Sequence, residues 1–459
     1  MKVMKFGGGC LKNAETLGRV ADIVARERRK PAVVVSALQG VTDQLIAGAA
    51  AARIDERTIP DRISRLWDRH VKVAEGAIRD EAVREETLRA IEIALQRTER
   101  LLYGVAYTGE ASPAIHNRVL SGGERLAARL VAGAVRARGI AARPLDSDRI
   151  GLVTDDNLEN ATANLALFRR SFRRTAAEIR RGLYVPVVTG FFGVTPEGRI
   201  SLFGRNGSDY SASVLAHGLD ARRLEIWKDV GGFMSADPGA EKSARKIDRL
   251  SYYEAAELAY FGARILHPRT LEPLTGMAAD VRIKSLADPD DPGTEIGRRA
   301  PVRRNVVKSV TANEGIALLR IHGPGVGYKP GIIGRIGRRL SELRINIYSI
   351  ITAQTCINLL VDRKDARRGY QALRDDRNGV MARIDLEEDV SLVAVVGEGM
   401  VERRGVAAQI FSAVARAGIN VEMISSGASE VATYFIVDRA DTGRAVRALH
   451  REFFGLNRP

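Results

Sequence analysis

Three uninterrupted apolar runs constrain the fold of this chain more than any other feature of its sequence. They are "PAVVVSA" at 31–37, "YVPVVTGFFG" at 184–193 and "RLEIWKDVGG" at 223–232. Runs without polar alternation are typical of strands that are buried on both faces. A shorter strand is expected over Val3–Phe6, and helical patterns separate the strands. This alternation predicts an α/β fold with an open, mainly parallel sheet sandwiched by helices.

The segments between these strands carry helical signals. We predict helices over Asn13–Arg29, from about Thr42, over 59–106 and over Ser121–Arg138. Asn13 suits the N-cap of the first helix, because its side chain can accept a hydrogen bond from the first turn. Gly139 is expected to end the last helix.

The composition argues against several classes of protein. The chain has only two cysteines, Cys10 and Cys356, which lie far apart. This argues against a disulfide framework and suits a reducing compartment. The N-terminus has no apolar signal core, and no apolar run approaches the roughly 20 residues of a membrane span. We therefore expect a soluble, cytoplasmic protein with no membrane partner.

The formal net charge of +15 raises the question of nucleic acid binding. The basic residues are spread along helical segments such as Arg26–Lys30 and Arg169–Arg181, and acidic residues are interleaved with them. Aromatic residues make up only 5% of the chain and do not alternate with a basic stripe. We interpret the charge as an arginine-rich surface that attracts small anions such as nucleotides, and we expect no nucleic acid partner.

The last third of the chain contains an internal repeat. Before it, "ADPDDPG" and "RRAPVRRN" suggest a linker or a long excursion near 287–305. Residues 315–350 then align with 389–424, and each copy has a strand, a glycine turn, an amphipathic helix and a second strand. We predict one large domain over 1–300 and two βαββαβ modules over 306–380 and 385–459, which pack together within or between chains.

Glycine-bearing loops accompany the predicted strands: "KFGGGC", "VSALQGVTD", "SGGERL", "TGFFG" and "GRNGSDYSA". In an open α/β sheet, ligands bind outside the carboxyl ends of the strands, and helix N-termini there attract anions. Gly7, Gly8 and Gly9 would let phosphates approach the main chain, and Lys5 would add a positive charge. Arg205 can hold a carboxylate with two hydrogen bonds. The loops together predict a phosphate-binding site.

Several polar residues in these loops allow two interpretations. Ser208 and Asp209 lie where a helix N-cap belongs, so they could simply cap a helix. Glu124 could form a capping box with Ser121, or its carboxylate could bind an ammonium group. Thr42 could likewise be an N-cap or part of a binding site.

The order of these motifs resembles that of the aspartate kinases of the amino-acid kinase superfamily. The matching stretches are "KFGG", "VVVSA..GVTD", "S.GERLAA", "GFFG", "GR.GSDYSA", "IW.DV.G", "ADP" and "SYYEAAELAYFGARILHPRTLEPL". The repeated tail resembles the pair of ACT domains that these kinases carry, above all in "GVAAQIFSAVARAGINVEMISSGASE". The resemblance runs from Met1 to about Phe454. It implies an amino-acid kinase fold followed by two ACT modules.

The resemblance implies a phosphotransferase that converts ATP and L-aspartate to ADP and 4-phospho-L-aspartate, the first step of lysine, threonine and methionine biosynthesis. No homoserine dehydrogenase segment follows the tail, so a single activity is expected. Mg²⁺ would bridge the phosphates with few direct protein ligands. Lys5 and Asp209 would be catalytic, Arg205 would hold a carboxylate of aspartate, and Glu124 would hold its amino group. The other substrate-binding residues implied are Thr42, Phe191 and Ser208. The nucleotide-binding residues implied are Gly7, Gly8, Gly9, Lys228, Asp229, Met234 and Arg264.

Several positions depart from the family pattern. Gly9 and Cys10 stand where the pattern has Thr and Ser, and Asn206 stands where it has Gly. Cys10 is interpreted as a small, inert substitute for Ser, with a reactive thiol as the alternative. In the nucleotide-binding stretch, the changes are Lys228 for Thr, Met234 for Tyr, Gly239 for Arg and Arg264 for Lys.

These departures leave two hypotheses open. The changes would weaken ATP binding, although the cationic Lys228 and Arg264 could compensate. The first hypothesis is an active aspartate kinase with an altered nucleotide site. The second is a weak or inactive paralogue that acts as an amino-acid-sensing regulatory subunit, or a kinase for another small carboxylic acid.

The tail is expected to bind an amino-acid effector, because the ACT pair of the family binds end products such as lysine or threonine. A ligand that favours one arrangement of the modules would bias the kinase. The expected effector edge consists of Pro330, Gly331, Ile332, Asn346 and Ile347. We also expect a homodimer or larger oligomer through the ACT modules. The alternative is a tail that serves only for dimerisation.

Overall fold

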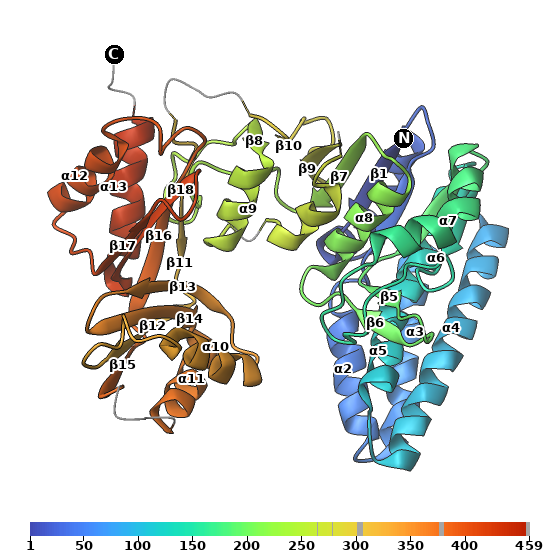
Figure 1. The fold of residues 1–459 in the computed structure, drawn as a ribbon. Coiled ribbons are helices and arrows are strands. Elements are labelled where there is room, and N and C mark those ends of the chain that lie inside the picture. Colours follow the sequence, from blue (N-terminus) through green and yellow to red (C-terminus); the bar gives the residue numbers. More distant parts are fainter. Residues whose placement is uncertain (264, 278, 301–305, 376–380, 456–459) are drawn as a thin grey trace. The chain divides into compact units, whose positions relative to one another are not determined.

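The chain forms two compact units, each with its own sheets and core (Figure 1). The computed structural model describes residues 1–263, 265–277, 279–300, 306–375 and 381–455. The first unit comprises Met1–Phe233, Asp248–Tyr252 and Ile265–Arg299. The second comprises Met234–Ile247, Tyr253–Arg264 and Ala300–Pro459. We describe each unit by itself.

The first unit is built on an eight-stranded sheet with the order β3-β4-β2-β1-β7-β9-β10-β8. Its strands are β1 (Lys2–Phe6), β2 (Ala32–Val35), β3 (Ala142–Leu145), β4 (Val185–Thr189), β7 (Arg223–Lys228), β8 (Arg249–Ser251), β9 (Asp280–Ser285) and β10 (Thr294–Gly297). All neighbouring strands from β3 to β9 are parallel, whereas β10 runs antiparallel to β9. The mainly parallel sheet is therefore confirmed.

Helices cover both faces of this sheet. They are α1 (Ala14–Ala25), α2 (Val41–Ala52), α3 (Ile59–Ala77), α4 (Glu81–Thr108), α5 (Pro113–Leu120), α6 (Gly122–Arg136), α7 (Leu165–Arg180) and α8 (Gly207–Gly218). On one face α6 contacts β2, β3 and β4, and α1, α3 and α4 pack against α6. On the other face α8 contacts β1, β2 and β7, with α7 against it.

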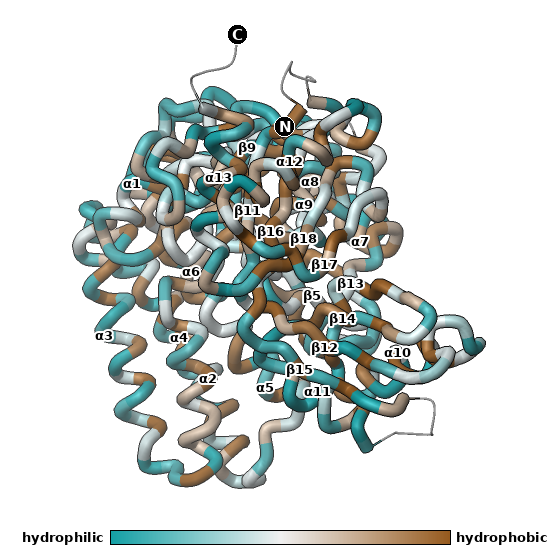
Figure 2. The backbone as a smooth tube through the Cα atoms, turned by 90° about the vertical axis from the view of Figure 1, so that its left-hand side faces the viewer, coloured by the Kyte–Doolittle hydropathy of each residue, from teal (hydrophilic) through white to brown (hydrophobic). Residues whose placement is uncertain are grey.

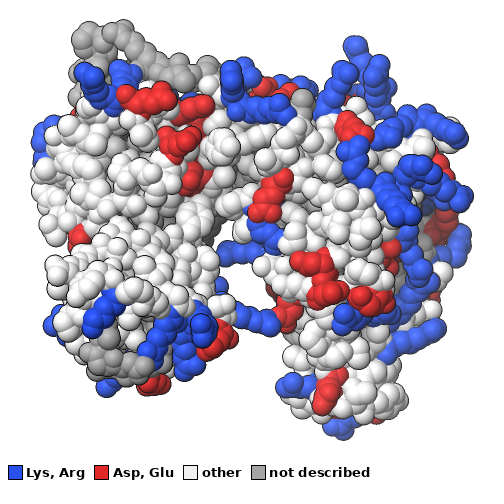
Figure 3. All heavy atoms as spheres, viewed as in Figure 1, with Lys and Arg blue, Asp and Glu red and all other residues white. Residues whose placement is uncertain are grey.

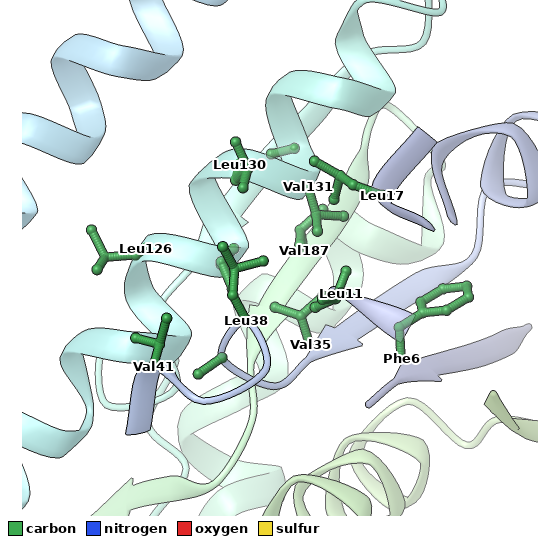
Figure 4. Packing of buried hydrophobic residues seen from close by; sticks show 14 of the residues in the cluster. Phe6, Leu11, Leu17, Val35, Leu38, Val41, Leu126, Leu130, Val131 and Val187 are labelled. Atoms are coloured by element: carbon green, nitrogen blue, oxygen red, sulfur yellow. The ribbon is translucent and has the colours of Figure 1, made fainter. Parts of the chain in front are cut away.

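The alternation of side chains along β1 shows how the two faces differ. Phe6 belongs to the same hydrophobic cluster as Val35 and Val187 of the neighbouring strands and Leu126 and Leu130 of α6 (Figure 4). The neighbouring Lys5 projects to the opposite face, where it contacts α8. Successive side chains of a strand point to opposite faces. One face of β1 therefore belongs to the core, and the other carries a charge.

Local signals placed most of these helices correctly. Asn13 caps α1, because its side chain accepts a hydrogen bond from Thr16 N at 3.0 Å. The stretch 59–106 is helical as predicted and contains two helices, since α3 ends at Ala77 and α4 starts after the N-cap Asp80. Along α3 and α4 hydrophobic and hydrophilic stretches alternate (Figure 2), as expected for amphipathic helices.

The stretch 184–193 forms a buried strand that runs into a glycine turn, as predicted, because Gly190 and Phe191 turn the chain between β4 and β5 (Phe192–Val194), which pairs with β6 (Ile200–Leu202). The stretch near 287–305 is not simply a linker, because it contains β10 of the large sheet. Residues 301–305 lie outside the described residues.

The second unit contains two four-stranded antiparallel sheets. One has the order β13-β14-β12-β15, and the other has the order β11-β16-β18-β17. The strands are β11 (Ser309–Asn313), β12 (Ile316–His322), β13 (Ile347–Thr352), β14 (Cys356–Asp362), β15 (Arg383–Glu387), β16 (Val390–Val396), β17 (Met423–Ser426) and β18 (Ala432–Asp438). The helices are α10 (Ile332–Glu342), α11 (Arg363–Asp375), α12 (Val406–Arg416) and α13 (Thr442–Phe454).

The internal repeat predicted from the sequence is present in this unit. β12, α10 and β13 of the first copy correspond to β16, α12 and β17 of the second. Strand β11 precedes the first copy in the chain but pairs with β16 of the second copy. Each copy has a separate hydrophobic core.

Helix α9 (Tyr252–Tyr260) follows β8 and passes from the first unit into the second. Within the second unit, Glu254 accepts a hydrogen bond from Lys308 Nζ and one from Glu398 N, each at 2.7 Å. Tyr260 donates to Tyr348 O at 2.9 Å, and the ring of Phe261 packs on Tyr434. The C-terminal part of α9 is thus fixed to both sheets of this unit.

None of the described helices is both long and apolar enough to cross a bilayer. Basic side chains are frequent on the face drawn in Figure 3, but acidic ones lie among them. On α7, for example, Arg169 and Arg180 both pair with Asp220. The arginine-rich segments are therefore partly neutralised by local ion pairs.

Candidate active site

The candidate site lies at the carboxyl edge of the parallel strands in the first unit. Strands β4, β2, β1 and β7 are consecutive and parallel, so the loops that follow them lie side by side. Two hydrogen bonds join these loops directly, from Ser36 N to Phe6 O and from Gly190 N to Val35 O. The glycine loops that are far apart in the sequence meet here.

The glycine loop after β1 forms a single short helical turn over Gly8–Cys10. A Cβ atom at Gly7 would lie 3.2 Å from Lys5 Nζ, and one at Gly8 would lie 3.4 Å from Ala37 O. Side chains at these positions would crowd Lys5 and the loop after β2. The bare backbone suits the close approach of an anion.

Lys5, Asp209 and Lys228 form a buried charged cluster. Lys5 Nζ lies 2.5 Å from one carboxylate oxygen of Asp209, and Lys228 Nζ lies 3.0 Å from the other. Burial would raise the pKa of Asp209, but the two ammonium groups outweigh it and hold that pKa below its usual range. Asp209 is therefore an ionised group that orients two lysines.

Glu124 lies at the start of α6 and is fully buried. One carboxylate oxygen accepts a hydrogen bond from Ala37 N at 3.1 Å, and the other has no hydrogen-bond partner among the described residues. Burial raises the pKa of Glu124 to about 8, against the opposing effects of the Ala37 N–H and the Lys5 ammonium. The unpaired oxygen marks a place where a donor such as an ammonium group can bind.

The interpretation of Ser208, Asp209 and Glu124 as helix-capping residues is wrong. The N-cap of α8 is Asn206, so Ser208 and Asp209 lie inside the first turn. Ser121 makes no capping hydrogen bond to α6, and its hydroxyl donates to Arg118 O instead.

Thr42 is also not a cap, because α2 starts at Val41 behind Gly40. Thr42 is half-buried in the first turn of α2. Its position after the β2 loop leaves it at the same edge of the sheet.

The start of α8 is shaped by a left-handed residue. Asn206 has a φ of 57°, a conformation that suits Gly and is tolerated by Asn. The change from Gly to Asn in "GRNGSD" therefore keeps the backbone of this turn. Arg205, which precedes Asn206, is exposed. Ser208 packs closely against Gly190, because a Cβ atom added at Gly190 would lie only 2.6 Å from the Cβ atom of Ser208.

Phe191 also adopts a left-handed backbone, with a φ of 70°. Such a conformation costs energy in a non-glycine residue and often occurs at functional sites. Its carbonyl oxygen accepts a hydrogen bond from Phe203 N, which fixes the turn between β4 and β5 next to α8.

Comparison with known proteins decides the family. The model of the amino acid kinase family matches residues 1–285, and an ACT domain model matches residues 393–453. The chain belongs to the amino acid kinase family. Chloroplastic aspartokinase 3 of Arabidopsis thaliana is 30% identical over 98% of this kinase and 81% of its own length. Aspartokinase of Schizosaccharomyces pombe is 28% identical, and the match covers 98% of this kinase and 92% of that protein.

Solved structures agree with this assignment over the whole chain. Aspartokinase III of E. coli in complex with aspartate and ADP has a TM-score of 0.83 and 27% identity, covering 99% of this kinase and 100% of that chain. The same enzyme in complex with lysine and aspartate has a TM-score of 0.81, 27% identity and 99% coverage of both chains. These comparisons support aspartate kinase activity and ATP use, and none supports the inactive-paralogue alternative.

The nucleotide-binding residues expected in this kinase are only partly brought together. Lys228 ends β7 and Asp229 follows it, beside the glycine loop, and a Cβ atom at Gly9 would lie 3.5 Å from the Asp229 carboxylate. Met234 belongs to the second unit, where it pairs with Lys246. Arg264 lies outside the described residues.

The surroundings of Cys10 support the interpretation that it is an inert substitute for Ser. Its side chain is fully buried and donates a hydrogen bond to Trp227 O at 3.2 Å. Burial raises the pKa of the Cys10 thiol to about 11, so little thiolate is present at neutral pH.

The expected effector residues lie at two separate places in the first ACT module. Pro330, Gly331 and Ile332 are at the N-terminus of α10, whereas Asn346 and Ile347 follow its C-terminus, where Ile347 begins β13. An 11-residue helix is about 16 Å long. The two places therefore lie at opposite ends of α10.

The donor set fits a magnesium ion that is held mainly by phosphates. Among the described residues, no group of three or more His, Cys, Asp or Glu side chains could hold a metal ion. The buried carboxylate of Asp209 is occupied by two lysines, and the Asp229 carboxylate is exposed beside Gly9. Asp229 is thus the carboxylate best placed to contact a phosphate-bound ion.

One residue near the site was missed in the sequence analysis. His267 begins the turn η3 (Pro268–Leu274), and its ring accepts a hydrogen bond from Arg269 N. Burial lowers the pKa of His267, and the charges of Arg205 and Asp209 also act on it. The sequence signal was its place in "ILHPRT", inside the last stretch that carries the family resemblance.

Proposed function

We propose that this protein is an aspartate kinase that transfers the γ-phosphoryl group of ATP to the side-chain carboxylate of L-aspartate. The observation that carries the proposal is the buried Lys5–Asp209–Lys228 cluster beside the glycine loop, with the unpaired oxygen of Glu124 at the same edge. The cluster suits phosphates, and Glu124 suits the amino group of an amino acid.

The reaction needs little from the protein beyond positioning and charge. A carboxylate oxygen of aspartate attacks the γ-phosphorus, the bond from that phosphorus to the β–γ bridging oxygen breaks, and ADP leaves. The attacking carboxylate is already ionised at neutral pH, so no base has to remove a proton. This fits an Asp209 that is paired with two lysines and not free to act as a base.

Each residue then has a physical role. The N–H groups of Gly7–Gly9 and the N-terminus of α8 face the phosphates, and Lys5 stabilises negative charge on the transferred group. Arg205 holds a carboxylate of aspartate, and Glu124 holds its ammonium group. Thr42, Ser208 and Phe191 line the amino-acid pocket. Magnesium, when bound with ATP, neutralises phosphate charge, and Asp229 would contact it.

The ACT modules would regulate the enzyme by binding an amino acid, with lysine or threonine as the candidates. Because the two expected effector places lie apart in one module, a second module or a second chain would have to complete the site. This favours a homodimer or larger oligomer. A cytoplasmic location remains a prediction, since several relatives are named as chloroplastic.

The test is aspartate-dependent release of ADP, with binding of ATP–magnesium measured by calorimetry on the same sample. We expect ADP release with L-aspartate and none with L-asparagine, which lacks the attacking carboxylate. Lys5→Met should abolish turnover and leave aspartate binding intact. Nucleotide binding without transfer to aspartate would reject the proposal in favour of another acceptor acid.

A further inference from the structure

Arg125 follows Glu124 on α6, and none of the roles proposed for the reaction belongs to it. Its guanidinium carbon lies 4.9 Å from the centre of the Phe192 ring. One terminal nitrogen lies 2.7 Å from Asp146 Oδ2, and the other donates to Asp148 Oδ1 at 3.0 Å. The side chain is 19% exposed, so these contacts are largely shielded from water. A planar guanidinium suits this place, because it can stack on a ring and bind carboxylates at its edge at the same time.

The turn that carries these two aspartates is itself fixed to the end of β4. Ser147 lies between the aspartates, and its backbone N–H donates to Thr189 Oγ1 at 2.8 Å. Its hydroxyl donates to Thr189 O. Thr189 is the last residue of β4 and directly precedes the turn at Gly190 and Phe191. The guanidinium on α6 and the end of β4 are therefore held by the same short segment.

Arg125 thus links two parts of the proposed amino-acid pocket. Neighbouring residues of an α-helix point about 100° apart, so Glu124 and Arg125 reach different surroundings. Glu124 accepts a hydrogen bond from Ala37 N in the loop after β2. Arg125 covers the ring of Phe192, whose preceding residue Phe191 has the left-handed φ of 70°. Such a backbone persists only where its surroundings hold it in place.

We propose that Arg125 is a positioning residue that fixes the Phe191 turn relative to Glu124 and thereby sets the length of the amino acid that the pocket accepts. This inference rests on the proposed function, because it takes Glu124 and Phe191 to face one substrate. A turn held at a constant distance from the group that binds the ammonium gives a pocket of fixed length. Such a pocket accepts L-aspartate and disfavours L-glutamate, which is longer by one methylene group.

The test compares two arginines on the same helix. Arg125→Met removes the guanidinium and keeps an unbranched apolar side chain. Arg129→Met is the matched control, because Arg129 is 17% exposed and binds the same Asp146 at 3.1 and 3.2 Å. In the part of the chain that the structure describes, Arg129 pairs with neither Asp148 nor the Phe192 ring. The two variants therefore share the loss at Asp146 and differ in the contact with the turn.

Binding of L-aspartate and of L-glutamate is measured by calorimetry, and kcat and KM are measured with each acid. Urea unfolding of both variants checks that they are folded. We expect Arg125→Met to raise the KM for aspartate about 10-fold with a smaller change in kcat, because a displaced turn misplaces the substrate. The KM for ATP should stay unchanged.

The preference for aspartate over glutamate is the measurement that a merely structural role would not change. In Arg125→Met the ratio of kcat/KM for the two acids should fall by about 10-fold, whereas Arg129→Met should keep the ratio of the wild type. Arg125→Lys is a second variant if the Met variant does not fold. It keeps a positive charge but not the planar group that binds two carboxylates and a ring, so the ratio should fall there too.

An unchanged ratio in a folded Arg125 variant would overturn the inference, as would an equal fall in Arg129→Met or a wild type that accepts both acids equally. The proposed function fails separately. A wild-type protein that binds aspartate but phosphorylates neither acid would reject the kinase proposal, and calorimetry with the two acids would still decide the role of Arg125. A wild-type protein that binds neither acid would reject both.

Discussion

Glu124 is the residue whose surroundings say most about the substrate. One of its carboxylate oxygens accepts a hydrogen bond from Ala37 N, and the other is buried without a hydrogen-bond partner among the described residues. Glu124→Gln keeps the hydrogen bond from Ala37 N but cannot ionise to pair with an ammonium group. We expect the KM for aspartate to rise by at least about 10-fold, since hydrogen bonds to charged groups are among the strong ones. Steady-state kinetics with both substrates varied would show this. A matching rise in the KM for ATP would contradict the assigned role.

The same residue sets a pH dependence. The pKa of Glu124 is raised from an ordinary value of 4.5 to about 8. Between these two pH values the Glu124 carboxyl keeps its proton in the folded protein but loses it in the unfolded chain. Stability should therefore fall as pH rises from about 4.5 to 8. Urea unfolding at pH 5 and pH 8 should show that the free energy of unfolding falls more between these pH values for the wild type than for Glu124→Gln. Equal losses would mean that Glu124 is ionised in the free enzyme.

At the scale of single elements, the start of α8 depends on the left-handed backbone of Asn206. Asn206→Gly should be tolerated, because Gly adopts this conformation freely. Asn206→Val should cost roughly 1–2 kcal/mol, because a β-branched residue is strained there. Urea unfolding of both variants checks this. Equal stability of the two would show that the turn relaxes.

The start of α9 depends on a buried ion pair. Lys308 and Glu254 are 4% and 0% exposed. Lys308→Met removes the ammonium group from the buried pair with Glu254, so we expect the free energy of unfolding to fall by about 3–5 kcal/mol. Arg439→Met is the control, because its pair with Glu314 is exposed and contributes less than about 1 kcal/mol. Chemical unfolding monitored for the second unit measures both. A small loss in Lys308→Met would mean that Glu254 becomes protonated instead.

At the scale of the whole molecule, the two units have separate hydrophobic cores. Differential scanning calorimetry should therefore show two unfolding transitions. A ligand stabilises the unit that binds it, by about 2.7 kcal/mol at 100 times its Kd. ADP with magnesium should raise the transition of the first unit. Lysine or threonine, if it is the effector, should raise that of the second. One transition that both ligands raise equally would contradict independent cores.

The sequence by itself determined the central strands β1, β2, β4 and β7, the mainly parallel sheet, the repeated tail and the order of the glycine loops. These follow from local patterns, since an unbroken apolar run such as 31–37 can be satisfied only by burial on both faces. Parallel pairing then brings the loops to one edge, where Lys5 was expected beside phosphates, and the family resemblance added Asp209 and Glu124.

The tertiary structure alone decided what these residues contact. Local signals suggested capping for Ser208, Asp209 and Glu124, yet Asp209 pairs with two lysines and Glu124 accepts from Ala37 N across 87 positions of the chain. Strand β11 likewise joins the sheet of the second copy. Such partners are fixed by packing between distant segments, and no local pattern encodes which charge will lie opposite which once the cores have formed.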